Sequence, residues 1–128
     1  MRNRLVMALV TAPCLGCGAP RLELTEDPLR VTVRQRQADV IPGSGDRLVL
    51  KVDDVTAGQV LVSIDDRYDG AVVRTRSVRR GDVTEFRVGD RTYYLSVVEL
   101  RNFLAGEDFG VFEISSRPPG AARTGASR

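Results

Sequence analysis

The chain has 128 residues, with 19 basic and 17 acidic side chains, two cysteines, and neither histidine nor tryptophan. Without histidine, and with only Cys14 and Cys17 as sulfur ligands, the sequence lacks the ligand set of a zinc site. The chain has two more basic than acidic side chains, a difference that Arg2 and Arg4 account for. The other charges of both signs are interspersed along the chain. We therefore expect neither a nucleic-acid-binding surface nor a nucleic-acid partner.

Residues 1–17 have the order of an export signal. Arg2 and Arg4 are followed by an apolar stretch, and Leu15-Gly16-Cys17 ends it. The stretch 5–16 would cover only about 18 Å as a helix, against about 30 Å for the hydrocarbon core of a bilayer. A removable signal is therefore favoured over a membrane-spanning helix.

The segment Leu15-Gly16-Cys17 resembles the lipobox of bacterial lipoproteins, although Cys14 stands where that motif favours Leu, Val or Ile. The resemblance implies removal of residues 1–16, lipidation of Cys17 and a lipid bilayer as one partner. Gly18 in place of Asp after the cysteine implies the outer membrane in a Gram-negative cell. The resemblance covers this segment only. An ordinary secretory cut after Gly18, or a cytosolic N-terminus with two unrelated cysteines, are the alternatives.

The rest of the chain divides by composition. Residues 17–28 are predicted to form a tether, and residues 29–115 one β domain. Residues 116–128 contain no large apolar side chain, so they cannot offset the entropy of ordering and are predicted to be a disordered tail. Flexible segments are thus expected at both ends.

Apolar residues alternate through the predicted domain, as in Leu48, Leu50 and Val52, and glycine- and aspartate-rich turns separate the alternating runs. The pattern predicts an all-β fold, a small antiparallel β-sandwich of about seven strands, with a small open β-barrel as the alternative. An exposed edge strand over residues 71–78 could accept a strand from a partner, unless its arginines prevent pairing.

A hairpin around Gly89-Asp90 is the clearest element. With these residues as its turn, Phe86 lies opposite Tyr93 and Thr84 opposite Leu95, and one face of the hairpin is apolar. The alternation breaks after Val97, which predicts a bulge or a strand end there. A single helical turn is expected between residues 99 and 108, followed by a last strand over residues 109–114.

Three acidic residues, Asp65, Asp66 and Asp69, precede a glycine and are weak candidates for a Ca²⁺ site, although an acid-rich turn is the simpler interpretation. Tyr68 and Tyr94 are weak candidates for partner binding, because tyrosine offers a large contact area at low entropic cost.

No catalytic residue is identified. Gly43-Ser44-Gly45 would present a serine without an imidazole partner, so it is interpreted as a loop, with a small hydrolase as a remote alternative. We therefore expect a membrane-anchored envelope lipoprotein whose β domain is a structural or protein-interaction module that needs no cofactor. Its expected protein partner belongs to the cell envelope. A small-ligand or Ca²⁺-binding module is the alternative.

Overall fold

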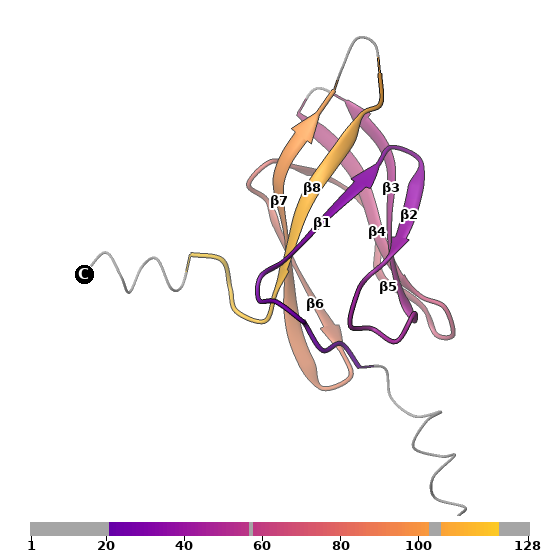
Figure 1. Cartoon of the computed structure of the whole chain (residues 1–128), viewed down its shortest axis with the longest axis vertical. Coiled ribbons are helices and arrows are strands. Elements are labelled where there is room, and N and C mark those ends of the chain that lie inside the picture. The colour runs from indigo at the N-terminus through magenta and orange to yellow at the C-terminus, as the bar shows by residue number, and fades with distance from the viewer. Residues whose placement is uncertain (1–20, 57, 103–105, 121–128) are drawn as a thin grey trace, which may run out of the picture.

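Two four-stranded antiparallel sheets face each other in the computed structural model, which describes residues 21–56, 58–102 and 106–120 (Figure 1). The strands are β1 (Leu29–Arg34), β2 (Gln37–Val40), β3 (Leu48–Thr56), β4 (Gln59–Asp66), β5 (Gly70–Arg79), β6 (Val83–Val88), β7 (Arg91–Arg101) and β8 (Phe109–Ser115). The predicted all-β sandwich is confirmed, and the barrel alternative is wrong because the sheets stay separate and open. None of these described ranges forms a helix that could cross a bilayer.

The sheet orders are β1-β8-β7-β6 and β2-β3-β4-β5. Neighbouring strands follow each other along the chain, except that β1 pairs with β8, with Leu29 opposite Ile114. The chain passes from one sheet to the other between β1 and β2 and again between β5 and β6. The first and last strands of the domain therefore lie side by side.

The described part of the chain has eight strands instead of about seven, because the short edge strand β2 was not predicted. Its residues are mostly exposed, and only Val40 is partly buried. Pairing with β3, which places Ala38 opposite Lys51, creates this strand. With only four residues, and Ala38 and Val40 as its apolar side chains, the segment is too short to give a clear strand signal.

The core lies between the sheets and is formed by alternate residues of the strands, with Leu48, Leu50, Ile64 and Phe112 fully buried. The predicted hairpin is confirmed in its register, with Phe86 opposite Tyr93. The rings of these two residues stack with centroids 5.9 Å apart.

The predicted bulge after Val97 is confirmed, but the expected helical turn is wrong where the structure describes it. The register shifts between Val97 and Glu99, and β7 then continues to Arg101 opposite Phe109. The extra residue at the bulge turns the side chain of Leu100 back toward the core, against which it packs. Residues 103–105, on which the rest of that turn depended, lie outside the described residues.

Leu22 and Leu24 pack against the core of the sandwich, in the stretch that the sequence assigned to a tether. Leu22 is buried, and its carbonyl oxygen accepts a 2.6 Å hydrogen bond from the Tyr93 hydroxyl. The Glu23 N–H donates to the Gly43 carbonyl oxygen at 2.9 Å. The chain is therefore attached to both sheets before β1 begins. Cys17 and residues 121–128 lie outside the described residues.

Gly43 is required where this N-terminal segment crosses the β2–β3 loop. A Cβ atom there would lie 2.0 Å from the Glu23 carbonyl oxygen. We expect Gly43→Ala to displace residues 21–23, expose Leu22 and lower the free energy of unfolding by about 2 kcal/mol. Faster amide exchange at Glu23 and a lower Tm would show this.

Gly45→Ala is the matched control for Gly43→Ala. Gly45 also has a positive φ angle, of 66°, but no atom lies within 4 Å of its added Cβ. Equal acceleration of Glu23 exchange in both variants would contradict the proposed collision.

Gly110 leaves space for an aromatic ring in the core. A Cβ atom at this position would lie 2.7 Å from Phe112 Cζ and 3.3 Å from Leu100 Cδ2. Because Phe112 is fully buried and cannot move outward, Gly110→Ala should cost about 1–3 kcal/mol of stability in urea unfolding. Thr32→Ala, an exposed change on the adjacent β1, should cost much less; similar losses would contradict this account.

Candidate functional site

The three acidic candidate ligands do not converge. Asp65 and Asp66 are consecutive residues of β4, so their side chains lie on opposite faces of the sheet. The Asp65 carboxylate is 4.0 Å from Lys51 Nζ on the outer face, whereas Asp66 is buried. In the described ranges, His, Cys, Asp and Glu side chains form no group of three or more that could hold a metal ion.

Asp66 instead organises the β4–β5 turn. Arg47 Nε donates to both of its carboxylate oxygens, at 2.8 and 3.0 Å. The Asp66 Oδ1 atom also accepts from the backbone N–H groups of Tyr68 and Asp69, at 2.9 and 3.3 Å. Arg47 reaches Asp69 as well, with Nη2 3.0 Å from Oδ2. One buried carboxylate thus joins the β2–β3 loop to the turn.

These contacts decide the protonation of Asp66. Burial alone would raise the pKa of the carboxyl, but hydrogen bonds from Arg47 and from the Tyr68 and Asp69 N–H groups outweigh it and lower that pKa. The same pairing raises the pKa of the Arg47 guanidinium. Asp66 is therefore ionised at neutral pH, and the turn that it holds is fixed in that state.

Tyr68, a predicted partner-binding residue, projects from this turn. Its side chain is 77% exposed, and its ring lies over the Arg47 guanidinium at 5.0 Å from ring centroid to Cζ. A fixed turn and a cation–π contact therefore support a large exposed aromatic side chain. Such an aromatic group can contact another surface with little loss of conformational freedom.

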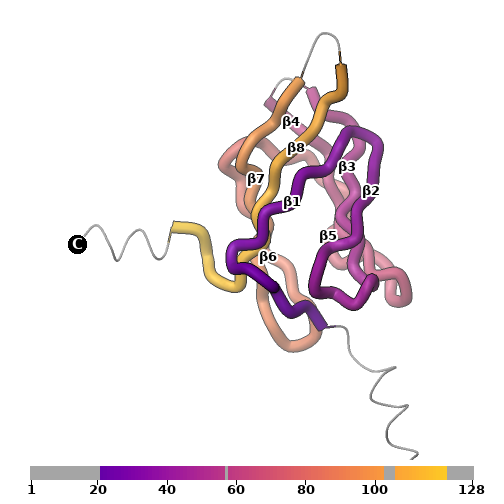
Figure 2. The backbone as a smooth tube through the Cα atoms, in the orientation of Figure 1, coloured from indigo at the N-terminus to yellow at the C-terminus, as the bar shows by residue number. Residues whose placement is uncertain are grey.

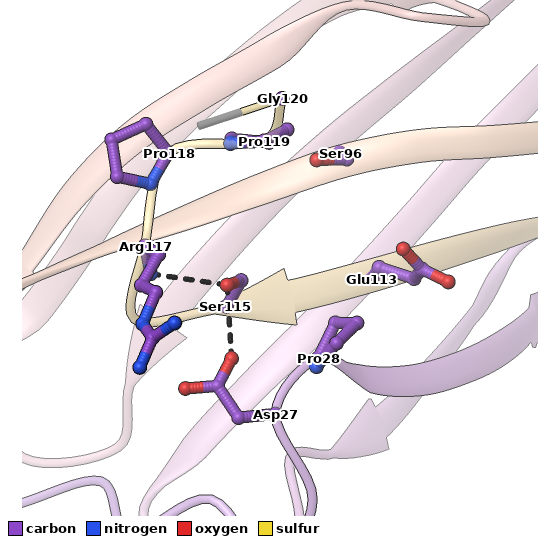
Figure 3. Close-up of a pocket in the computed structure, with 9 residues that line it drawn as sticks. All are labelled: Asp27, Pro28, Ser96, Glu113, Ser115, Arg117, Pro118, Pro119 and Gly120. Carbon is purple, nitrogen blue, oxygen red and sulfur yellow. Dashed lines mark hydrogen bonds between the residues drawn. The ribbon is translucent and has the colours of Figure 1, made fainter. Parts of the chain in front are cut away.

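Tyr94, the second predicted candidate, lies far from Tyr68 along the chain, on β7 opposite Ser115 of β8. Its side chain is partly buried. Ser115, the residue opposite Tyr94, lines a hollow of about 460 Å³ between the outer face of the sheet and the chain after β8, which we call the β7–β8 hollow (Figure 3). Its lining includes Pro28, Ser96, Glu113, Ser115, Pro118 and Pro119.

Asp27 fixes the wall of the β7–β8 hollow. Its carboxylate accepts hydrogen bonds from the hydroxyls of Ser115, at 2.9 Å, and Ser116, and from the Ser116 N–H at 3.2 Å. The Ser115 hydroxyl in turn accepts from the Arg117 N–H at 3.0 Å, as Figure 3 shows. The Ser116 hydroxyl, followed by Ser115 and by the charge of Arg117, lowers the pKa of Asp27 despite its partial desolvation.

Ser44, the serine of the glycine loop, has a structural role. It is buried, its hydroxyl donates to the Ile41 carbonyl oxygen at 2.7 Å, and it accepts from the Leu48 N–H at 3.1 Å. The loop interpretation is confirmed, and the hydroxyl is not presented as an exposed nucleophile.

The sequence did not indicate the β7–β8 hollow, because its residues come from three distant segments. Asp27 precedes β1, Ser96 belongs to β7 and Ser115 ends β8. Only the pairing of β1 with β8 brings these segments together. The proline pair at residues 118–119 is the one local signal, and by itself it is typical of a tail.

Comparison with known proteins finds no matching family model, no matching curated protein and no matching solved structure.

Asp66→Asn tests the electrostatic role of the buried carboxylate. Because its pKa is lower in the folded protein than in the unfolded chain, Asp66 stabilises the fold above the unfolded pKa of about 3.9, and this contribution is lost as pH falls below it. The variant should be less stable at pH 7, and its free energy of unfolding should fall less on acidification. Urea unfolding between pH 7 and 3 measures both effects.

Asp65→Asn is the control for this series, since that carboxylate lies on the outer face and only its 4.0 Å contact with Lys51 is lost. It should change stability by less than about 1 kcal/mol at every pH. An Asp66→Asn curve parallel to that of the parent protein would contradict the role assigned to Asp66.

Proposed function

We propose that this chain is a lipoprotein of a bacterial cell envelope, anchored through acylated Cys17, and that its β-sandwich acts by binding another envelope protein. The observation that carries the proposal is Leu15-Gly16-Cys17 at the end of a basic and then apolar N-terminal segment. Each buried methylene of an acyl chain contributes about 0.8 kcal/mol, so two or more chains hold a protein at a bilayer. Gly18 directs it to the outer membrane where the cell has one.

The β7–β8 hollow and Tyr94 form the proposed protein-binding surface. The hollow combines serine hydroxyls with the rings of Pro118 and Pro119, a mixture of polar and apolar groups that suits a protein interface. The hydrogen bonds to Asp27 hold this surface in shape. A partner would therefore meet a surface that needs little rearrangement.

Addition of a partner strand to the edge of β5 is a less favoured way for the same partner to bind. β5 is an edge strand, but its register against β4 shifts between Val62 and Ile64, and Arg74 and Arg76 on it are exposed. Bulges and charged side chains both oppose pairing at an exposed sheet edge. The outer face of β7 and β8 is therefore favoured over this edge.

Small-ligand binding in the β7–β8 hollow is the second candidate. Its volume of about 460 Å³ falls in the range of small-molecule sites, which is about 300–1,000 Å³. A ligand of this kind would raise the Tm of the isolated protein without any partner protein. Calcium, the other ligand expected from the sequence, has no geometric support, because the three acidic candidate residues do not converge on one point.

Mass spectrometry of the mature N-terminus tests the anchor. The parent protein should begin at an acylated Cys17 and sediment with membranes, whereas Cys17→Ser should lose the acyl mass and the membrane association. Cys14→Ser is the matched control and should leave both unchanged. An unmodified N-terminus at residue 19, or full-length protein in the cytosol, would contradict the proposal.

Filling the hollow tests the binding surface. Ser96→Arg places a long side chain in the β7–β8 hollow, and Thr32→Arg places the same side chain on the exposed face of β1, outside its lining. Crosslinks to an envelope protein in intact cells should fall at least tenfold for Ser96→Arg only. Equal crosslinking in the two variants, at equal protein level, would exclude the β7–β8 hollow as the surface that binds the partner protein.

A further inference from the structure

We propose that one end of the sandwich lies on the same bilayer that holds Cys17, with Tyr68 in the layer of lipid headgroups. This end, the anchor end, consists of the β2–β3 loop and the β4–β5 and β6–β7 turns. The inference rests on the proposed anchorage at Cys17, and it adds the orientation of the domain and a second contact with lipid.

The length of chain between anchor and fold limits the position of the domain. Only four peptide steps separate Cys17 from Arg21, and a fully extended chain spans at most about 14 Å over that length. Leu22 is already buried between the sheets. The sandwich therefore lies close to the acylated residue. The connection between them is too short to let the domain move far from the bilayer surface.

The described contacts place the start of the chain at the anchor end. Arg21 and Leu22 lie beside Asp90 of the β6–β7 turn and Arg91, which begins β7. On the other sheet, the Glu23 N–H donates to Gly43 of the β2–β3 loop. Figure 2 shows the indigo chain entering at the end where these connections lie.

The β4–β5 turn belongs to the same end. The Arg67 N–H donates to the Arg47 carbonyl oxygen at 2.9 Å, which joins this turn to the β2–β3 loop. Tyr68, the next residue, has the most exposed large apolar side chain among the described residues. The anchor end therefore carries a large exposed ring that is available to a neighbouring surface.

Tyrosine is suited to a lipid headgroup layer, because its ring is apolar and its hydroxyl remains hydrogen-bonded. The ring of Tyr68 is already supported by Arg47, and the turn is fixed by Asp66. Contact with lipid therefore costs little side-chain entropy. The position next to the anchor, rather than the ring alone, favours a bilayer over a protein as its partner.

Charges at the anchor end are largely balanced. Arg21 pairs with Glu23 at 3.3 Å, and Arg47 is shared between Asp66 and Asp69. Asp90 in the β6–β7 turn and Arg91 at the start of β7 are neighbours of opposite sign. We therefore expect contact with neutral lipid, with little dependence on anionic lipid or on salt.

Single tryptophans provide the test, because the natural chain has none. Full-length acylated Tyr68→Trp is reconstituted into phosphatidylcholine vesicles with brominated acyl chains, and quenching of its fluorescence is compared with the same vesicles without bromine. Tyr68→Trp should lose most of its emission and shift to shorter wavelength. Adding anionic lipid or raising the salt concentration should change this little.

Arg80→Trp is the matched control. Arg80 is exposed in the β5–β6 turn. Because β5 begins at Gly70, two residues after Tyr68, and ends at Arg79, this turn lies at the opposite end of the strand. Its emission should stay unquenched on the same vesicles. Circular dichroism of both variants confirms that the fold is retained.

The outcomes separate the orientation from the anchor. Flotation of Tyr68→Trp with vesicles but without quenching, or equal quenching of Tyr68→Trp and Arg80→Trp, would overturn the orientation and leave the anchor intact. Failure of the acylated protein to float would overturn both. Loss of crosslinks to an envelope protein in Tyr68→Ala, with no quenching of Tyr68→Trp on vesicles, would assign the ring to a protein partner and also overturn the inference.

Discussion

The pairing of the first strand with the last is the constraint on which the rest of the structure depends. Because β1 lies against β8, with Arg30 Nη2 2.8 Å from the Glu113 carboxylate across the pair, both ends of the domain meet on one sheet. Asp27 thereby reaches Ser116, and the chain after β8 becomes one wall of the β7–β8 hollow. A pairing between segments so far apart costs loop entropy, which the shared core of the two sheets offsets.

On the other sheet, the ion pair between Arg47 and Asp66 also joins two separate segments, the β2–β3 loop and the β4–β5 turn. It fixes the turn from which Tyr68 projects, and it uses acidic residues that would otherwise be available to a cation. Our two proposals assign different surfaces to different partners, with Tyr68 assigned to the bilayer and the β7–β8 hollow, together with Tyr94, assigned to a protein. The bilayer contact of Tyr68 depends on the proposed anchor at Cys17.

Several features could be predicted because they follow from local patterns. Alternation in β3 and β4 and the Gly89-Asp90 turn specify strands and one hairpin register, since side chains alternate across a strand and turn length fixes the pairing. The break after Val97 predicted the bulge. It did not show that β7 resumes beyond the bulge, because the partner that extends it, β8, is supplied by distant residues.

The sequence by itself determined an all-β fold with alternating core positions and favoured a sandwich over an open barrel, and it predicted Cys17 as the lipid anchor. Tertiary structure alone decided that Leu22 belongs to the core, that Arg47 pairs with the buried Asp66, and that a hollow forms between β7, β8 and the chain that follows β8. The physical reason is that strand parity is local, whereas burial, ion pairing and surface shape depend on which distant segments the sheets bring together.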